Sequence, residues 1–374
     1  MELQELCSYV KTKVETSNYS IEDYISTENM LPEKGGITIA SSFPSGKVTE
    51  FQENDILISN IRPYFKKIWR ANRSGCCSND VLCIRANNNV DAEFLYYLLS
   101  QDLFFAYVMS GANGSKMPRG DKQQIMNWEI EIPSEKEDQR RIASILSSLD
   151  RKIELNNKIN ADLEEMAQAI FKSWFVDFEP FKDGKFVDSE LGMIPEGWKV
   201  GTLGDFCNVF TGKKNTNQAI EKGLYPFFSC APEPLASNDA IFKGKAIIIA
   251  GNGSYTGRTM FYNGGFDLYQ RTYACTIREQ DKENLMIFFY HMMKQFFEPV
   301  KMGGTRGSSI PYIVMGDITQ QDFPYSEEWL IRFSNIANSM MDRKLRIDKE
   351  NSRLSTLRDT LLPRLISGEI EVPE

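Results

Sequence analysis

The sequence carries one series of motifs twice, about 193 residues apart. The paired segments are 94–97 with 287–290, 111–118 with 304–311, and 150–153 with 342–345. This period far exceeds the roughly 20–50 residues of solenoid repeats. The pattern therefore predicts two copies of one globular domain, each followed by a long helix. Because the copies are similar but not identical, they suggest a target with two different parts.

Length and composition fit two or three globular domains, since the chain has 374 residues of which 42% are hydrophobic. No apolar run approaches the roughly 18 residues that span a membrane, and the first residues do not resemble a signal peptide. The seven cysteines form no C-x-x-C pair, and the only histidine is His291. We expect a reduced, cytoplasmic chain without a metal site.

Two segments, 135–175 and 326–362, contain neither glycine nor proline. Their apolar residues alternate in steps of four and three, which is typical of a coiled-coil seam of period 3.5. In the first helix this seam comprises Ile142, Leu146, Leu149, Ile153, Asn156, Asn160, Leu163 and Ile170. In the second helix it comprises Ile336, Met340, Ile347, Leu354, Leu357 and Leu361, and Pro363 is expected to end the helix.

Connectivity predicts that these helices pair in an antiparallel coiled coil, because the second must run back along the first to bury its seam. The two asparagines would fix the register of that pair. Two helices packed into separate cores are the alternative.

The predicted fold class is α+β, with two similar target-recognition domains ("heads") separated by the antiparallel two-helix coiled coil and related by a pseudo-twofold internal repeat. The predicted boundaries are 1–133 for head 1, 134–178 for the central helix, 179–197 for a linker, 198–325 for head 2 and 326–374 for the second helix and tail. Head 1 is expected to have strands at 56–58, 64–65, 68–69, 81–84 and 128–132 and a helix at 92–109. Head 2 is expected to have strands at 246–250, 259–262, 273–277 and 318–323 and a helix at 283–301.

A net charge of −8 does not indicate a nucleic-acid-binding protein, but the segment 56–79 has five basic residues and no acidic one. Basic side chains can neutralise phosphates, and Asn or Gln can contact adenine in the major groove. The candidates for DNA contact in head 1 are Asn60, Arg62, Tyr64, Lys66, Lys67, Arg70, Lys116 and Arg119. Those in head 2 are Lys213, Lys214, Ser254, Tyr255, Arg258, Gln270, Arg271 and Arg306. Each of them taken singly can instead be an ordinary solvated surface residue.

Motifs for catalysis are missing from the sequence. It has no G-x-x-x-x-G-K-[ST] loop, and Thr256 stands where a dinucleotide fingerprint beginning at Gly251 needs its third glycine. No Pro-Pro dipeptide occurs, so the amino-methyltransferase signature is also missing. The sequence predicts a protein that is not an enzyme and binds no cofactor of its own.

Four segments resemble the specificity subunit of type I restriction–modification systems. They are DQRRIA at 138–143, AIFKSWFVDFEP at 169–180, LGMIPEGW at 191–198 and RDTLLPRLISGEI at 358–370. The resemblance implies that each head binds one half of a bipartite, asymmetric target in double-stranded DNA. It also implies that the helices are a spacer and a platform for two methyltransferase (M) subunits, which are joined by restriction (R) subunits.

The same resemblance implies that S-adenosylmethionine, ATP and Mg²⁺ belong to those partner subunits and not to this chain. Alternatives are the specificity subunit of a related system that is not of type I, and a coiled-coil protein scaffold without DNA specificity. Head 1 starts almost at residue 1, with Leu3 and Cys7 matching Leu203 and Cys207. If the segment 370–374 packs beside head 1, it can supply the missing edge.

Overall fold

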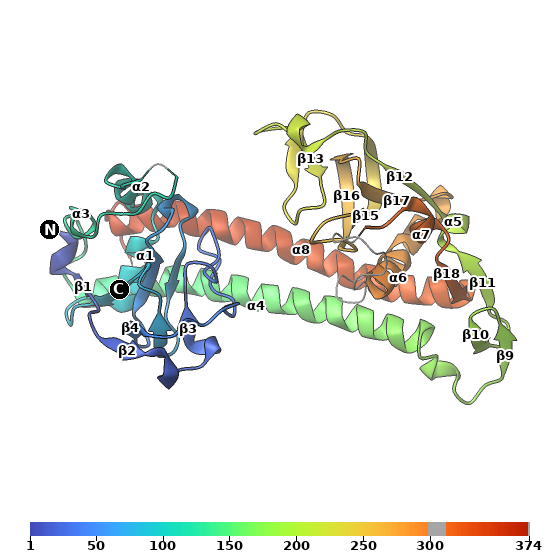
Figure 1. The fold of residues 1–374 in the computed structure, drawn as a ribbon, viewed down its shortest axis with the longest axis horizontal. Helices are drawn as coiled ribbons and strands as arrows, with labels where there is room; N and C mark the ends of the chain where they lie inside the picture. The colour runs from blue at the N-terminus through green and yellow to red at the C-terminus, as the bar shows by residue number, and fades with distance from the viewer. Residues whose placement is uncertain (115, 298–311, 373–374) are drawn as a thin grey trace. The chain divides into compact units, whose positions relative to one another are not determined.

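The computed structural model, which describes residues 1–114, 116–297 and 312–372, divides into two compact units (Figure 1). Unit 1 comprises residues 1–155 and the chain from Glu350 onward, and unit 2 comprises Asn156–Lys349. Two 40-residue helices, α4 (Lys136–Phe175) and α8 (Glu327–Ile366), pass through both units. Each unit therefore contains one head and a part of each long helix.

Head 1 has two four-stranded sheets and three helices. One sheet has the order β1 (Cys7–Tyr9), β8 (Val81–Ala86), β5 (Ile56–Ser59), β6 (Ile68–Arg70). The other has the order β2 (Lys13–Glu15), β4 (Lys47–Phe51), β7 (Gly75–Cys77), β3 (Tyr24–Ile25). The helices are α1 (Ala92–Leu99), α2 (Asp102–Ser110) and α3 (Lys122–Met126).

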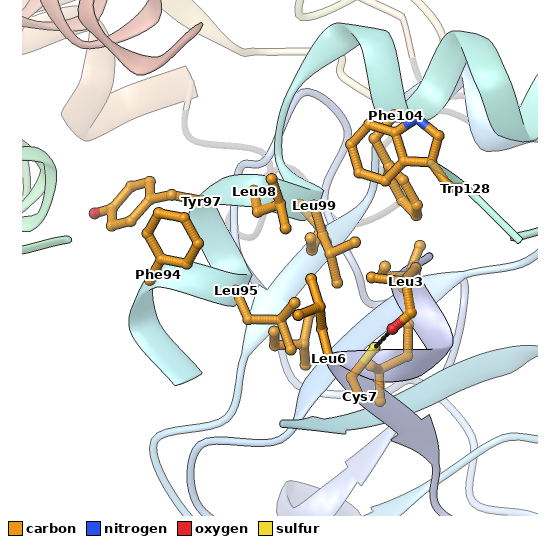
Figure 2. Close-up of a cluster of buried hydrophobic side chains, with 14 of the residues drawn as sticks. Leu3, Leu6, Cys7, Phe94, Leu95, Tyr97, Leu98, Leu99, Phe104 and Trp128 are labelled. Atoms are coloured by element: carbon orange, nitrogen blue, oxygen red, sulfur yellow. Dashed lines mark hydrogen bonds between the residues drawn. The ribbon is translucent and has the colours of Figure 1, made fainter. Parts of the chain in front are cut away.

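The core of unit 1 forms where the first residues of the chain meet α1 and α2 (Figure 2). Leu3 and Phe94 are completely buried there, and Trp128 lies with its ring 5.1 Å from that of Phe104. Ile142 and Leu146 of α4 and Leu365 of α8 belong to the same cluster. Partly buried Ile370 and Val372 pack against it, but residues 370–372 form no strand and supply no sheet edge.

Head 2 is built around a six-stranded sheet. Its order is β12 (Cys207–Thr211), β17 (Thr272–Ile277), β15 (Phe242–Ala250), β16 (Thr259–Leu268), β13 (Tyr225–Phe228), β14 (Leu235–Ser237). Two further two-stranded antiparallel sheets pair β9 (Phe186–Ser189) with β10 (Gly192–Pro195), and β11 (Lys199–Thr202) with β18 (Asp322–Tyr325). The helices are α5 (Leu203–Phe206), α6 (Met286–Phe297) and α7 (Met315–Thr319).

The two heads share a strand register as well as a strand order. The order β1-β8-β5-β6 in head 1 corresponds to β12-β17-β15-β16 in head 2. In head 1, Ile56 of β5 lies opposite Arg70 of β6. In head 2, Ile247 of β15 lies opposite Phe261 of β16, so both members of the pair are shifted by 191 positions in the sequence. A one-residue slip would turn every side chain to the other face of the sheet, so identical register is a demanding test of the repeat. The predicted internal repeat is confirmed.

The helices α4 and α8 run antiparallel in both units. In unit 1, Asp150 pairs with Arg358 at 2.6 Å, and Lys152 pairs with Glu350 at 3.7 Å. In unit 2, the rings of Phe171 and Phe333 are 5.7 Å apart, and those of Trp174 and Trp329 are 4.9 Å apart. The residue numbers of the contacting α8 residues fall as those of the α4 residues rise, so the helices are antiparallel, as predicted. The supercoiling of the pair stays a prediction.

The predicted seam of α8 needs one correction. Ile336 and Leu357 are 36% and 46% exposed, whereas the adjacent Ala337 is buried and Arg358 is largely covered. The seam passes through the charged residues Lys344 and Arg358, which carboxylates of α4 neutralise. The spacing of apolar residues alone therefore predicts the wrong phase for this part of the α8 seam. Ile142, Leu146, Asn156, Asn160 and Ile347 are buried, and Leu149, Ile153, Leu163, Ile170, Met340, Leu354 and Leu361 are partly buried.

Several predicted elements were wrong in detail. Residues 64–65 lie in a 3₁₀ turn and not in a strand, because Arg62 has left-handed backbone geometry and Pro63 opens the turn. The helix expected at 92–109 breaks at Ser100, whose hydroxyl bonds the carbonyl of Tyr96, and Gln101 is extended. Residues 128–132 contribute only the isolated bridge of Glu129 with Glu2.

In head 2, residues 315–319 form α7, and the strand begins only at Asp322. A 3₁₀ helix at Gln280–Leu285 precedes α6, which was expected to begin at 283. The helix α8 does not end at Pro363 but at Ile366. A proline one turn from the end of a helix removes few helical hydrogen bonds, so the last turn can still form.

Candidate nucleic-acid interface

Three loops of head 1 are joined by hydrogen bonds into one surface, which we call loop cluster 1 (residues 60–62, 78–80, 113–114 and 116–121). The amide of Asn60 donates to the carbonyl of Asp80 at 2.9 Å, and the amide of Arg62 donates to the carbonyl of Pro118 at 2.8 Å. The guanidinium of Arg119 pairs with the Asp80 carboxylate at 3.2 Å. The loop that contains Pro118 and Arg119 is thus held against the segment that contains Arg62.

Arg62 and Lys116 are the cations that loop cluster 1 leaves available. Both side chains are exposed, and neither makes an ion pair with any residue that the structure describes. Arg62 has φ of 50° and caps the 3₁₀ turn Pro63–Phe65, so a local backbone feature fixes where its side chain starts. Arg119 is 55% exposed in spite of its pairing with Asp80. These three side chains are the cations of loop cluster 1 that a ligand can reach.

The other basic candidates of head 1 already have partners within the fold. Lys66 pairs with Asp102 at 3.1 Å, and Arg70 pairs with Glu93 at 2.7 Å. Lys67 donates to the carbonyl of Thr27 at 2.7 Å, and burial lowers its pKa. The basic and aromatic stretch around Tyr64 is therefore mainly structural, because acidic residues from distant segments neutralise it.

Asn60 and Tyr64 differ in how much of each side chain a ligand can reach. The Oδ1 atom of Asn60 is buried and has no hydrogen-bond partner, and it faces Gly120, where an added Cβ would approach it to 3.0 Å. Tyr64 is 45% exposed, with its ring 4.6 Å from that of Phe65. Tyr64 is available for contact, whereas Asn60 can act only through its amide nitrogen or after a rearrangement.

Head 2 assembles a corresponding surface, which we call loop cluster 2 (residues 213–215, 230–232, 251–258 and 269–271). The amide of Gln270 donates to the carbonyl of Lys214, and the amide of Gly251 donates to the carbonyl of Arg271, both at 3.0 Å. The guanidinium of Arg258 donates to the carbonyls of Ala231 and Pro232 at 2.6 and 2.9 Å. Segments that are up to 58 positions apart in the sequence thus lie side by side.

Loop cluster 2 also divides into available and engaged side chains. Lys213, Ser254, Tyr255 and Arg271 are exposed, and Tyr255 is 46% exposed. Gln270 is exposed as well, although its side-chain amide donates to Asn215 at 2.6 Å.

Lys214 is engaged, because it pairs with Asp239 and with buried Asp267 at 2.7 and 2.6 Å. Those two carboxylates raise the pKa of Lys214. Arg258 is held by backbone carbonyls, and Arg306 lies outside the described residues. The side chains of loop cluster 2 that remain available to a ligand are therefore those of Lys213, Arg271, Gln270 and Tyr255.

Sequence reasoning missed three exposed lysines beside loop cluster 1. Lys11, Lys13 and Lys122 line one open groove of head 1. The amide side chain of Asn79, in loop cluster 1, accepts a hydrogen bond from Lys13 at 2.6 Å. Lys122 is more than 100 positions from the other two, so no local pattern in the sequence unites them.

Among residues 1–114, 116–297 and 312–372, no group of three or more His, Cys, Asp or Glu side chains is arranged to hold a metal ion. Burial raises the pKa of Cys7 and of Cys207 to about 12, so both thiols stay protonated at neutral pH. None of the helices described is long and apolar enough to cross a membrane.

Comparison with known proteins identifies the class. A model of the type I restriction modification DNA specificity domain matches residues 1–165 and 195–325. The type I restriction enzyme MjaIX specificity subunit of Methanocaldococcus jannaschii is 28% identical over 308 residues, which cover 77% of this chain and 71% of that protein. The type I restriction enzyme HindI specificity subunit of Haemophilus influenzae is 24% identical over 464 aligned residues, which cover 98% of each protein.

A solved structure supports the same fold. The crystal structure of the type I restriction-modification S subunit from M. genitalium superposes with a TM-score of 0.58 over 98% of this chain and 95% of that chain, at 18% identity. The matched segments include both heads and much of α4. The chain therefore belongs to the type I restriction–modification DNA specificity family.

Proposed function

We propose that this chain recognises a bipartite, asymmetric target in double-stranded DNA, with one head for each half of the target. The observation that carries the proposal is that the heads share strand order and register while their loop clusters differ. Loop cluster 1 offers Arg62, Lys116 and Arg119, whereas loop cluster 2 offers Lys213, Arg271 and Gln270. Two different half-sites require heads that share a backbone framework and differ in their exposed side chains.

Within this proposal the chain supplies recognition and no chemistry. Cations of the loop clusters bind phosphates and position each head, while Gln270, Tyr255 and the guanidinium groups contact base edges. Methyltransferase and restriction subunits of the same complex would bind S-adenosylmethionine, ATP and Mg²⁺. The helices α4 and α8 would serve as their platform and as the spacer between the half-sites.

Methylome sequencing of cells that carry this chain with its methyltransferase subunits tests the proposal. We expect methylated adenines in a motif of two different halves with a fixed gap. A variant that lacks residues 153–159 and 349–355 loses one heptad from each helix but keeps the ion pairs at Asp150 and Glu164. Seven residues at about 1.5 Å each shorten a helix by about 10 Å, which corresponds to about three base pairs.

The heptad variant should therefore methylate the same two halves across a shorter gap. An unchanged gap would contradict the spacer role. A motif without a gap, or no sequence preference, would contradict bipartite recognition and favour a protein scaffold. Methyl transfer by the purified chain alone would show that it is an enzyme.

A further inference from the structure

Head 1 has an open groove of about 330 Å³ beside loop cluster 1. The polar side chains that line it include Tyr9, Lys11, Lys13, Thr49, Asn79 and Lys122. Three of these are lysines, and all three are exposed. The groove is thus a concave surface with a local positive charge on a chain whose net charge is −8.

The lysines of this groove differ from Lys34, Lys66 and Arg85 because no described carboxylate pairs with them. Lys34 and Lys66 pair with Asp102, and Arg85 pairs with Asp55. Lys13, in contrast, donates to two neutral oxygens, Thr49 Oγ1 at 2.9 Å and Asn79 Oδ1 at 2.6 Å. These bonds orient its ammonium group without cancelling its charge.

The nearby carboxylates bind other groups of the fold and form no described ion pair with the groove lysines. The carboxylate of Asp121, next to Lys122, accepts hydrogen bonds from the amides of Gln123 and Gln124 at the start of α3. The carboxylate of Glu50, next to Thr49, accepts a hydrogen bond from Tyr19 at 2.9 Å. Both carboxylates are already committed to the fold.

The groove is continuous with loop cluster 1 at two points. Asn79, which binds Lys13, precedes Asp80, which pairs with Arg119. Lys122 follows Gly120 and Asp121, which belong to the same loop. A DNA strand that meets loop cluster 1 would therefore have this groove beside it.

We propose that Lys11, Lys13 and Lys122 bind backbone phosphates of DNA that flanks the half-site recognised by head 1. The inference rests on the proposed function. Lysine ammonium groups are compact, strongly hydrated charges that bind phosphates without reading bases. The groove therefore adds affinity for any DNA sequence and leaves the choice of sequence to the loop clusters.

The test compares two triple variants in the complete complex with methyltransferase subunits. Lys11→Gln, Lys13→Gln and Lys122→Gln remove the groove charges, and Lys34→Gln, Lys66→Gln and Arg70→Gln remove ion-paired charges of the same head as the control. Dissociation constants are measured between 50 and 300 mM salt, for a duplex with the methylated motif and for one without it. Each phosphate contact contributes about 0.9 to the slope of log K against log salt.

We expect the groove variant to lower the magnitude of that slope by up to about 2.7 for both duplexes. The preference for the motif and the thermal stability should stay unchanged. The control variant should keep the wild-type slope. An unchanged slope in the groove variant, or an equal decrease in both variants, would overturn the proposal.

The two proposals fail in different ways. If the wild-type complex does not distinguish the duplexes, the proposed function is wrong. If it distinguishes them but the groove variant has the wild-type slope, only the phosphate-binding groove is wrong. A change in sequence preference without a change in slope would assign these lysines to base contacts and would also overturn the inference.

Discussion

The two units hold their heads to the long helices by the same kind of contact, made with different residues. In unit 1, Tyr97 of α1 donates to Asp150 of α4 at 2.7 Å, and Arg358 of α8 donates to the same carboxylate at 2.6 Å. In unit 2, Tyr290 of α6 donates to Glu164 of α4 at 2.7 Å, and Lys344 of α8 donates to it at 3.0 Å. The tyrosines are 193 residues apart, which is the period of the repeat.

In both units the carboxylate belongs to α4 and the cation belongs to α8. Asp342 of α8 is the counterpart of Asp150 in the repeat, yet the acceptor of Tyr290 is Glu164 of α4. The copies therefore kept the tyrosine, whereas the helix that supplies its carboxylate changed. Because α4 supplies the carboxylate and α8 supplies the cation in both units, each helix complements the other. Like charges facing each other in a seam disfavour pairing with an identical helix.

The contact in unit 2 is the more elaborate of the two. Lys294 also binds Glu164, at 2.8 Å, so two ammonium groups share one carboxylate. Burial would raise the pKa of Glu164, but hydrogen bonds from Lys294 and Tyr290 and the charges of both lysines outweigh it and hold that pKa at about 2. The pKa of Tyr290 is raised by burial and by Glu164.

The largest expected difference comes from removing the carboxylate charge in each unit. Glu164→Gln leaves Lys294 and Lys344 without a counter-ion and should destabilise unit 2 by about 3 kcal/mol. Asp150→Asn leaves only Arg358, which has Asp359 beside it at 2.9 Å, and should cost about 2 kcal/mol in unit 1. Hydrogen exchange measured by mass spectrometry reports which unit opens. An equal loss of stability in the two variants, or a greater loss for Asp150→Asn, would show that Lys294 adds nothing to the stability of unit 2.

A smaller difference is expected from acid, because His291 in unit 2 is the only histidine of the chain. Its side chain is buried and its Nδ1 lies 2.9 Å from Gln168 Oε1. Burial lowers its pKa to about 4, and the charges of Lys294 and Lys344 add to this, whereas Glu164 opposes it. The unfolded state therefore takes up a proton first, and the free energy of unfolding falls as the pH drops from about 6.5 towards 4.

At pH 5.5 this protonation should cost unit 2 about 1 kcal/mol and should cost unit 1 nothing. Hydrogen exchange at pH 7.5 and 5.5, corrected for the intrinsic rates, measures it. His291→Gln should abolish the difference between the two pH values in unit 2. If the variant keeps the wild-type pH dependence, other groups are responsible.

The fold could be predicted from the sequence where a long-range pattern or an extended run of one type defined it. The repeat, the strands around Ile58 and Ile249 and the helix α4 are of this kind. The break at Ser100 was not predicted, because apolar residues continue on both sides of it and no glycine or proline marks it. The phase of the α8 seam was missed because Arg358 lies in it and is neutralised only by a residue of another helix.

The candidate interface shows the same division. Arg62, Lys116 and Arg271 are exposed cations, as the sequence predicted. Lys66 looks equally basic in the sequence, but Asp102, which is 36 positions away, pairs with it. Whether a cation is available depends on which acidic residues the fold brings to it, and a count of local charge does not contain this information.

The most direct test of separate half-site recognition is methylome sequencing with a variant of loop cluster 2. The variant replaces Lys213, Gln270 and Arg271 by alanine in the chain that is produced with its methyltransferase subunits. We expect the half-site assigned to head 2 to change or become degenerate, while the other half and the gap stay the same. Loss or change of both halves together, or a wholly unchanged motif, would contradict the account.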